Sequence, residues 1–278
     1  MIFDSNTSVY AVFGDPVSHT LSPVMHNRAF EFTGYKGVYL AFCVKSIKNA
    51  LISVRTLGIK GASITIPHKI KVMKYLDETD DIAFKIGAVN TIINNGGCLK
   101  GYNSDGLGAV KALSEKTVIK GKNIAIIGAG GAARAVGFCI KKEGGRITVI
   151  NRSTDKGERL AVDLSADYRP LNDIGKMKCD ILINTTPVGM TPDTDGMPIE
   201  RRYLEKGMVV MDIVYNPLKT RLLSEAKKAG CITIDGVSMF VHQGAFQFEL
   251  WTGIKAPVDF MKKAVLNALQ AAKMNEKE

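Results

Sequence analysis

The sequence predicts an α/β fold in two domains, and three observations support this prediction. The chain has 278 residues, more than one small hydrophobic core usually organises. Short apolar runs alternate with helical segments along most of it, which is typical of parallel sheets with right-handed crossovers. Residues 123–153 then read as strand, glycine-rich turn, helix and second strand, the unit that binds dinucleotides.

Composition places the chain among ordinary globular proteins. Its hydrophobic content is 46%, and no apolar run reaches the roughly 20 residues of a membrane span. The first residues lack a basic segment followed by an apolar one, so we expect no secretory signal. The five cysteines are widely spaced, without a C-x-x-C pair. We therefore expect free thiols in a reducing cytoplasm rather than disulfides or a zinc site.

The formal net charge is +10. Nucleic-acid-binding proteins carry charges of this size, but the lysines here are scattered, with no basic run interleaved with aromatic residues. We expect a solvated basic surface that attracts anionic small molecules, and no nucleic-acid partner.

Residues 9–13 predict a first strand, which enters a loop rich in hydroxyl groups. Thr20 and Ser22 lie in that loop just before Pro23, which starts a helix. Taken alone, Ser22 is narrowly favoured as the helix N-cap. Hydroxyls at a helix N-terminus would also suit a substrate carboxylate. Further elements are then predicted at 24–32 (helix), 38–43 (strand) and 47–57 (helix).

Lys69 follows a short strand in 61–66 that Pro67 ends. Ligands bind at the carboxyl ends of strands in open α/β sheets. Most lysines are solvated surface residues, and this one stands out because it shares its loop with Thr65 and His68. A helix at 71–76 and an acidic turn at 77–81 are predicted next.

Asn90, Asn103 and Asp105 lie near the ends of a predicted hairpin whose turn is 94–97. Each alone is more simply a turn residue. Together with Thr65 and Lys69 they form a set able to bind a polyhydroxylated small molecule. A helix at 106–114 then leads to the dinucleotide unit.

The predicted strand 124–127 ends at Gly128-Ala129-Gly130-Gly131-Ala132-Ala133. Gly128 would allow the tight turn, Gly130 would let the backbone approach a pyrophosphate, and Ala133 would let the helix pack on the strand. The phosphates would lie at the N-terminus of a helix that starts near Ala132, where free N–H groups and the dipole favour negative charge.

The second strand of this unit, 147–150, ends in Asn151-Arg152-Ser153, with Lys156 one helical turn further on. NAD-binding units carry a carboxylate at this place, about 20 residues after the glycines, and none stands here. A guanidinium suits a 2′-phosphate. The sequence therefore predicts NADP(H) rather than NAD(H).

The rest of the chain continues the alternation. Helices are predicted at 155–165, 220–229, 236–251 and 258–273. Residues 180–190 predict a strand that ends in a polar loop, further strands are predicted at 208–215 and 232–234, and residues 191–203 are rich in turns.

These segments, in this order, resemble the shikimate dehydrogenase family along nearly the whole chain. Any one motif is weak, but the ordered set is specific. The motifs are Gly14-x-Pro16-x-x-His19-x-x-Ser22-Pro23, Thr65-Ile-Pro67-His-Lys69, Gly87-Ala-Val-Asn-Thr91, Asn103-Ser-Asp105, Gly128-Ala-Gly-Gly-Ala132, Asn151-Arg-Ser153, Asn184-Thr-Thr-Pro-Val-Gly-Met190, Asp212-Ile-Val-Tyr-Asn-Pro217 and Gln243-Gly-Ala.

The resemblance implies an enzyme of aromatic amino acid and chorismate biosynthesis that reduces 3-dehydroshikimate to shikimate with NADPH. It implies a substrate domain of residues 1–105 and 237–278, completed by the C-terminal helices, and a Rossmann-type NADP domain of residues 106–236. We expect a monomer or a homodimer, without a metal.

The resemblance also implies residue roles, with Lys69 as the catalytic acid/base and Asp105 as its partner. An ammonium suits this chemistry because hydride delivery to a ketone leaves an alkoxide that must be protonated. A nearby carboxylate would keep the ammonium charged. The implied substrate residues are Thr20, Ser22, Thr65, Asn90, Tyr215 and Gln243. The implied cofactor residues are Gly128, Ala129, Gly130, Gly131, Ala132, Asn151, Arg152, Ser153, Lys156, Thr185 and Met239.

The chain departs from the family pattern at four positions. Thr20 stands where Ser is usual, Ser63 where Asn is usual, Ser104 where Thr is usual, and Lys156 where a second Arg is frequent. These departures leave open how strictly shikimate is chosen over quinate and how tightly the 2′-phosphate is held.

Three other functions compete with this interpretation. A quinate/shikimate dehydrogenase that uses NAD is disfavoured by Arg152. A methylenetetrahydrofolate dehydrogenase would need an aromatic platform for a pterin, and the loops around Lys69 and Asn90 have none. An NADP-sensing regulatory protein without turnover would have no use for a proton donor such as Lys69 beside Asp105.

Overall fold

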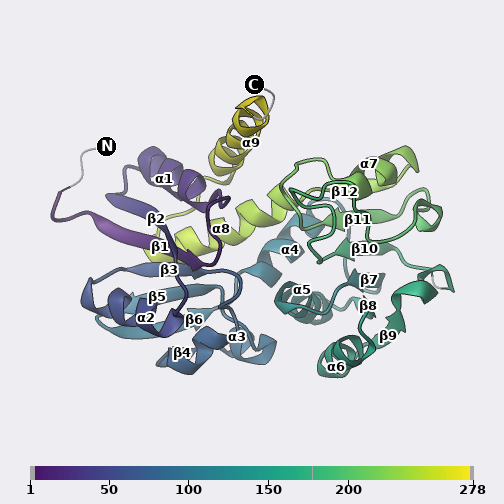
Figure 1. Cartoon of the computed structure of the whole chain (residues 1–278), viewed down its shortest axis with the longest axis horizontal. Helices are drawn as coiled ribbons and strands as arrows, with labels where there is room; N and C mark the ends of the chain where they lie inside the picture. The colour runs from purple at the N-terminus through teal and green to yellow at the C-terminus, as the bar shows by residue number, and fades with distance from the viewer. Residues whose placement is uncertain (1–3, 177, 276–278) are drawn as a thin grey trace. The chain divides into compact units, whose positions relative to one another are not determined.

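The computed structural model describes residues 4–176 and 178–275. It comprises two compact units: residues 1–104 with 243–278, and residues 105–242. Residues 1–3 and 276–278, the two ends of the predicted substrate domain, lie outside the described residues. Each unit contains its own six-stranded sheet flanked by helices (Figure 1). This confirms the predicted α/β fold class.

The sheet of the first unit is mixed, with strand order β2-β1-β3-β5-β6-β4. Three of its six strands, β1, β2 and β3, are parallel to one another, whereas β5 runs antiparallel to both β3 and β6. The predicted hairpin is confirmed as β5–β6, and Gly96 and Gly97 supply the positive φ of its turn. The strands are β1 (Ser8–Gly14), β2 (Gly37–Cys43), β3 (Gly61–Ile64), β4 (Glu78–Thr79), β5 (Thr91–Asn95) and β6 (Cys98–Tyr102).

Helices cover both faces of this sheet. α2 (Ile47–Thr56) buries Ile47, Leu51 and Val54 in the core beneath it. On the other face α1 (Ser22–Thr33) contacts α9 (Val258–Asn275). α8 (Gly236–Thr252) brings Trp251 so close to Gly61 that an added Cβ there would meet its indole ring.

Residues 71–75, within the helix predicted at 71–76, form a short 3-10 helix, η1 (Lys71–Tyr75). One local prediction for the first unit was wrong. The predicted acidic turn contains the start of α3 (Asp81–Ile86). Asp80 caps α3 by accepting from the backbone N–H groups of Ile82 and Ala83, and Gly87 ends it in the left-handed conformation.

The sheet of the second unit is parallel throughout, with strand order β12-β11-β10-β7-β8-β9. Numbered within the unit and read from β9, this is the 3-2-1-4-5-6 order of doubly wound dinucleotide-binding folds. The strands are β7 (Asn123–Ile127), β8 (Arg146–Asn151), β9 (Asp167–Pro170), β10 (Ile181–Asn184), β11 (Val209–Asp212) and β12 (Ile232–Ile234). The helices are α4 (Asp105–Ser114), α5 (Gly131–Lys142), α6 (Thr154–Leu164) and α7 (Arg221–Lys228), with 3-10 turns η2 (Leu171–Lys176) and η3 (Arg201–Tyr203).

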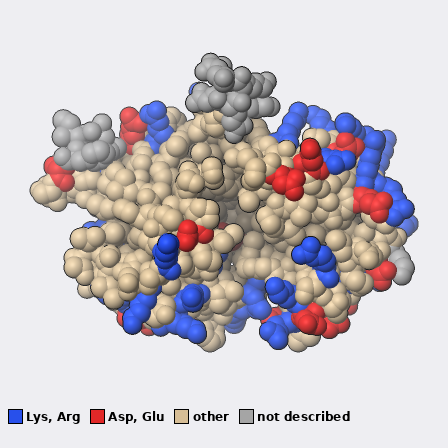
Figure 2. Space-filling model, viewed as in Figure 1, with Lys and Arg blue, Asp and Glu red and all other residues tan. Residues whose placement is uncertain are grey.

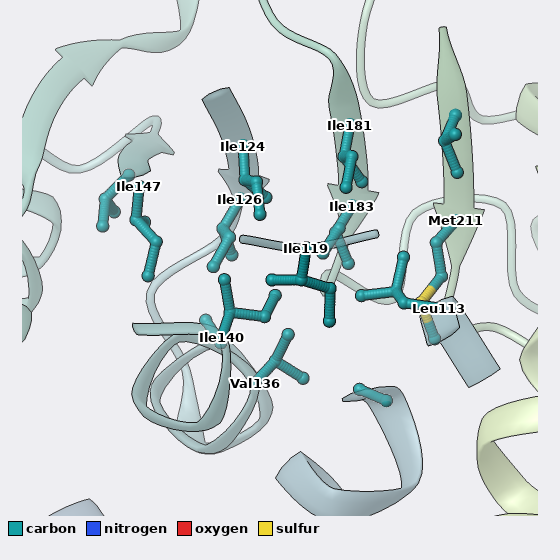
Figure 3. Packing of buried hydrophobic residues seen from close by; sticks show 14 of the residues in the cluster. Leu113, Ile119, Ile124, Ile126, Val136, Ile140, Ile147, Ile181, Ile183 and Met211 are labelled. Carbon is teal, nitrogen blue, oxygen red and sulfur yellow. The ribbon is translucent and has the colours of Figure 1, made fainter. Parts of the chain in front are cut away.

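Alternate residues of the central strands enter two cores because both faces of this sheet are covered. Ile124 and Ile126 of β7 meet Val136 and Ile140 of α5 on one face (Figure 3). Ala125, from the same strand, belongs to the second cluster on the other face, which includes side chains of α7. Burying an Ile side chain contributes about 1.5–3 kcal/mol, so these layers fix the position of the turn that joins β7 to α5.

Basic side chains are scattered over the face shown in Figure 2 and are interspersed with acidic ones. No helix in the described part of the chain is both long enough and apolar enough to cross a membrane.

Candidate active site

The predicted residues of the first unit gather at one edge of its sheet. Ser63 pairs with Thr91, and Thr91 pairs with Tyr102, so β3 and β6 end where β5 begins. The Ile64 amide donates to the Asn90 carbonyl at 2.8 Å, and the Asn90 amide donates to the Tyr102 carbonyl at 3.0 Å. The antiparallel hairpin thus brings Asn90 to the carboxyl ends of parallel strands, which sequence spacing alone did not establish.

Lys69 is tied into the same edge through its backbone. The Val89 amide donates to the Lys69 carbonyl at 2.9 Å, which places Lys69 beside Asn90. The ring of His68, only 3% exposed, lies with its Nε2 2.7 Å from the Val44 carbonyl oxygen and anchors the loop. The backbone amide of His68 donates a hydrogen bond to the Thr65 carbonyl at 2.9 Å. His68 therefore has a structural role in this loop.

Thr20 and Ser22 lie together at the start of α1. The Thr20 hydroxyl donates to the Ser22 hydroxyl at 3.2 Å and accepts from the Ser22 amide at 3.3 Å. The prediction that Ser22 caps α1 was wrong, because Leu21 holds the N-cap position and no side chain caps this helix. Ser22 is instead the first helical residue. Two hydroxyls beside an uncapped helix N-terminus are well suited to a carboxylate.

A buried polar cluster connects Asn90 to α8. Asn90 is 3% exposed and donates through Nδ2 to the Ser104 hydroxyl at 2.9 Å, and the Ser104 amide donates back to Asn90 Oδ1 at 2.8 Å. The Ser104 hydroxyl also lies 3.3 Å from Oε1 of Gln243. Asn103 donates through its side-chain Nδ2 to the Ala88 carbonyl at 2.9 Å, which ties the segment after β6 to the segment before β5.

Asp105 is the first residue of α4 and is 7% exposed. A carboxylate in the first turn of a helix is favoured by the helix dipole. Gly106 follows it, and an added Cβ at Gly106 would overlap the Ala135 carbonyl oxygen and Cys139 Sγ. The placement of Asp105 therefore depends on this close packing of α4 against α5.

Gly128 forms the turn after β7, at the point where the strand order reverses. Its φ is +113°, and an added Cβ would lie 2.6 Å from Thr185 Oγ1. Thr185 follows β10 and donates to the Ile127 carbonyl at 2.6 Å. The positive φ and the close approach of Thr185 explain why residue 128 is a glycine. In doubly wound folds the ligand binds at this switch point.

The next residues leave an open N-terminus on α5. Gly130 is the N-cap and Gly131 begins the helix, one residue before the predicted start near Ala132. No side chain caps the helix, and a Cβ at Gly130 or Gly131 would meet nothing within 4 Å. Ala129 and Ala132 on either side are partly exposed. Uncapped N–H groups with free space before them fit a pyrophosphate.

The end of β8 presents cations. Asn151 donates through Nδ2 to the Ser153 carbonyl at 2.8 Å and shapes the turn. Arg152, Ser153 and Lys156 are exposed. Among residues 4–176 and 178–275 neither Arg152 nor Lys156 forms an ion pair, whereas Arg134 on α5 pairs with Asp163. Cations without a carboxylate partner fit a phosphate ligand.

Tyr215 and Met239 lie within the second unit. The Tyr215 ring stacks on Phe240 with centroids 4.7 Å apart, and burial raises the pKa of the Tyr215 hydroxyl, which keeps it protonated as a donor. Met239 is 7% exposed and packs in the core that Figure 3 shows in part.

Asp212 is a buried residue at the end of β11 to which the prediction gave no role. Its carboxylate accepts from Asn184 Nδ2 at 3.0 Å and from the Thr220 hydroxyl at 2.7 Å, and burial raises the pKa of this carboxyl. These bonds join the loops after β10 and β11. No cluster of His, Cys, Asp or Glu able to hold a metal occurs within the described ranges.

Comparison with known families gives three matches along the chain. Residues 12–92 match the shikimate dehydrogenase substrate binding domain. Residues 111–235 match the family described as shikimate / quinate 5-dehydrogenase, and residues 236–266 match the shikimate 5′-dehydrogenase C-terminal domain.

Individual relatives are similar over almost their whole length. The shikimate dehydrogenase (NADP(+)) of Methanosarcina acetivorans is 47% identical over 278 residues, covering 95% of this chain and 99% of that protein. A crystal structure of a shikimate dehydrogenase in complex with NADP+ has a TM-score of 0.94 at 43% identity, covering 96% of this chain and 98% of that one. The Thermus thermophilus shikimate 5-dehydrogenase, in complex with NADP(H) and shikimate, has a TM-score of 0.89 at 35% identity, covering 94% and 100%.

Proposed function

This chain belongs to the shikimate dehydrogenase family, and from that membership we propose the direction and the acid–base chemistry of its reaction. It is an NADP-dependent shikimate dehydrogenase, an oxidoreductase of aromatic biosynthesis. It works as a reductase that converts 3-dehydroshikimate to shikimate. The main support for this proposal is the backbone hydrogen bond from the Val89 amide to the Lys69 carbonyl. It holds the backbone of Lys69 beside that of Asn90 at the polar edge of the sheet.

The two domains divide the work in this proposal. Residues 1–105 with 237–278 bind the substrate, and residues 106–236 bind NADP. The match of residues 12–92 to a substrate binding domain supports the first assignment. The parallel sheet with its switch point at Gly128 supports the second.

Substrate binding uses groups of complementary polarity. Thr20 and Ser22 hold the carboxylate at the uncapped start of α1. Thr65, Asn90, Gln243 and Tyr215 bind the ring hydroxyls and the ketone. Because a buried polar group without a partner costs about 1–3 kcal/mol, such a site discriminates against rings with missing or misplaced hydroxyls.

Lys69 carries the proton transfer. NADPH, when bound, supplies the hydride that reduces the carbonyl carbon. The Lys69 ammonium donates a proton to the carbonyl oxygen as negative charge develops there, and the resulting amine regains a proton from water. Asp105 favours the charged form of Lys69. Ketone, hydride and proton together give the alcohol.

Cofactor binding uses the β7–α5 turn and the end of β8. Residues 128–132 bind the pyrophosphate through backbone N–H groups. Arg152 and Lys156 bind the 2′-phosphate beside Asn151 and Ser153. Thr185 supports the turn from β10, and Met239 contacts the nicotinamide.

The enzyme works in the cytoplasm as a monomer or a homodimer. All five cysteines are free thiols, which suits a reducing compartment. Burial raises the pKa of Cys139 and of Cys179 to about 11, so these two thiols are unreactive at neutral pH.

The substitution Lys69→Ala tests the proposed chemistry. We expect kcat with 3-dehydroshikimate and NADPH to fall by about 10²–10⁴-fold, the usual contribution of a general acid, with the Kd for NADPH within twofold. Lys71→Ala, an exposed lysine two residues further on, should keep normal kcat. A Lys69→Ala enzyme of near-normal rate would remove Lys69 from its assigned role.

A matrix of shikimate and quinate against NADP and NAD tests the specificity. We expect the highest kcat/KM with shikimate and NADP. Higher kcat/KM with quinate and NAD would make the chain a quinate dehydrogenase, and NADPH binding without any turnover would make it a sensor.

A further inference from the structure

Four buried polar side chains lie behind Asn90 and have no role in the chemistry above. Tyr39 and Thr91 are fully buried, Gln247 is 1% exposed and Ser63 is 7% exposed. They come from β2, β5, α8 and β3, so only the folded unit brings them together. Buried polar groups need hydrogen-bond partners, and each of these finds one in the next.

The four residues form a continuous hydrogen-bonded chain that ends on Asn90. The Tyr39 hydroxyl donates to Ser63 Oγ at 2.6 Å, and Ser63 donates to Gln247 Oε1 at 2.9 Å. Gln247 Nε2 donates to Thr91 Oγ1 at 2.9 Å, and Thr91 donates to Asn90 Oδ1 at 2.8 Å.

The direction of this chain is fixed by chemistry. Gln247 Nε2 also lies 3.3 Å from the Asn90 carbonyl oxygen, which can only accept. The Gln247 atom facing it must therefore be the amide nitrogen, and the Gln247 oxygen must face Ser63. The single Ser63 proton then goes to Gln247, so the Tyr39 hydroxyl must be the donor to Ser63.

The same logic orients Asn90. Asn90 Oδ1 accepts from Thr91 and from the Ser104 amide, so Asn90 Nδ2 faces the Ser104 hydroxyl. That hydroxyl lies 3.3 Å from Gln243 Oε1 and 3.3 Å from Thr91 Oγ1. Asn90 thus turns its oxygen toward Thr91 and the Ser104 amide, and its Nδ2 toward the Ser104 hydroxyl.

We propose that Thr91, Gln247, Ser63 and Tyr39 are positioning residues that fix the amide orientation of Asn90. Asn90 thereby offers an N–H group rather than a carbonyl oxygen to the substrate, which selects ligand groups with acceptor oxygens, such as a ring hydroxyl or a carbonyl. The inference rests on the proposed function, since it takes Asn90 as a substrate residue. An Asn90 flip would leave the buried Ser104 amide facing an N–H donor, at a cost of about 1–3 kcal/mol.

Thr91 offers the sharpest test because its hydroxyl and methyl groups can be removed separately. Thr91→Val keeps the shape and loses the hydroxyl, whereas Thr91→Ser keeps the hydroxyl and loses the methyl. Thr33→Val is the matched control, because that hydroxyl bonds only to the Ala29 and Phe30 carbonyls within α1.

We expect Thr91→Val to raise the KM for shikimate about tenfold, the equivalent of one neutral hydrogen bond, with the KM for NADP within twofold. Thr91→Ser should have the wild-type KM for shikimate, even if its melting temperature is lower than that of Thr91→Val. Ser63→Ala, which removes the donor to Gln247, should shift the same KM in the same direction if Thr91→Val does not fold. A Thr91→Val enzyme with the normal KM for shikimate, or a Thr91→Ser enzyme as impaired as Thr91→Val, overturns the proposal.

A readout without catalysis separates this inference from the proposed function. In the NMR spectrum of the ligand-free protein, the side-chain amide protons of Gln247 and Asn90 should exchange slowly with solvent, and Thr91→Val should accelerate that exchange. Slow exchange in a protein that does not turn over shikimate would support the hydrogen-bonded chain and refute the proposed function. Fast exchange in an active wild-type enzyme would refute the hydrogen-bonded chain and leave the proposed function standing.

Discussion

At the residue scale, the proposed cofactor specificity depends on the charge of Arg152. Arg55 and Arg134 pair with Asp77 and Asp163, as surface cations commonly do. Within the described ranges, Arg152 has no such carboxylate, and its exposed guanidinium follows the β8 strand end. Arginine binds phosphate in a bidentate fashion that no neutral side chain reproduces. In the proposed function, the choice of NADP over NAD therefore rests on this guanidinium.

The substitution Arg152→Ala should weaken NADP binding selectively. A hydrogen bond to a charged group contributes about 1.5–3 kcal/mol, so we expect the KM for NADP to rise about 10–100-fold and the KM for NAD to change little. Arg146→Ala, at the start of the same strand with its guanidinium on the Gly121 carbonyl, serves as the control. Equal losses with both cofactors would mean that Arg152 does not read the 2′-phosphate.

At the element scale, two glycines of the β7–α5 turn differ in conformation and in surroundings. Gly128 has positive φ and contacts Thr185, so a side chain there is strained and crowded. Gly130 has φ −89° and free space where its Cβ would be. Both positions belong to one sequence motif, and these observations agree with the different tasks that the sequence predicts for them.

Alanine at the two glycines should therefore give opposite profiles. Gly128→Ala should lower the free energy of unfolding by about 1–3 kcal/mol. Gly130→Ala should leave the melting temperature unchanged and raise the Kd for NADPH at least tenfold, because its methyl group would occupy the pyrophosphate space. Thermal melts and fluorescence titration with NADPH measure the two effects. Normal NADPH affinity in Gly130→Ala would contradict the assigned phosphate position.

The elements that could not be predicted from the sequence lack a long apolar pattern. β9 reads Asp-Tyr-Arg-Pro and has no apolar run, so nothing local indicates an edge strand. α3 carried a readable signal, with Asp80 before it and Gly87 after it. The acidic cluster was interpreted as a turn because Asp favours both turns and N-caps.

At the scale of the whole molecule, one buried residue links stability to pH. His26 of α1 is fully buried and stacks on Tyr39 with ring centroids 4.5 Å apart. Burial lowers the pKa of His26 to about 3. The unfolded chain titrates near pH 6.5, so between those values the unfolded state binds one more proton than the folded state. Stability therefore falls as the pH drops from about 6.5 towards 3, by about 1.4 kcal/mol per pH unit.

The variant His26→Phe should remove this part of the acid sensitivity. Between pH 7.5 and pH 5.0 we expect it to lose about 2 kcal/mol less of its free energy of unfolding than the wild type. Urea unfolding followed by Trp251, the single tryptophan, reports on the unit that contains His26. His19→Phe, at an exposed position, should behave like the wild type. Identical pH profiles for His26→Phe and wild type would show that His26 does not dominate the response.

The sequence by itself determined the features whose parts are contiguous. These are the strand, turn and helix of residues 123–142 and the cation that ends β8. Turn chemistry and hydrophobic periodicity depend on residues that are close in sequence, so these features could be predicted. Lys69 could be singled out for the same reason, since its strand, Pro67 and loop adjoin one another.

Tertiary structure alone decided how dispersed polar residues meet. The register of β3 against β5 sets Ser63 opposite Thr91, and α8 then inserts Gln247 between their side chains. The N-cap of α1 was also not evident from the sequence: Leu21 holds that position, and the Ser22 hydroxyl accepts from Thr20. Each such bond needs atoms brought within about 3 Å, and a linear pattern of residue types does not encode that proximity between distant segments.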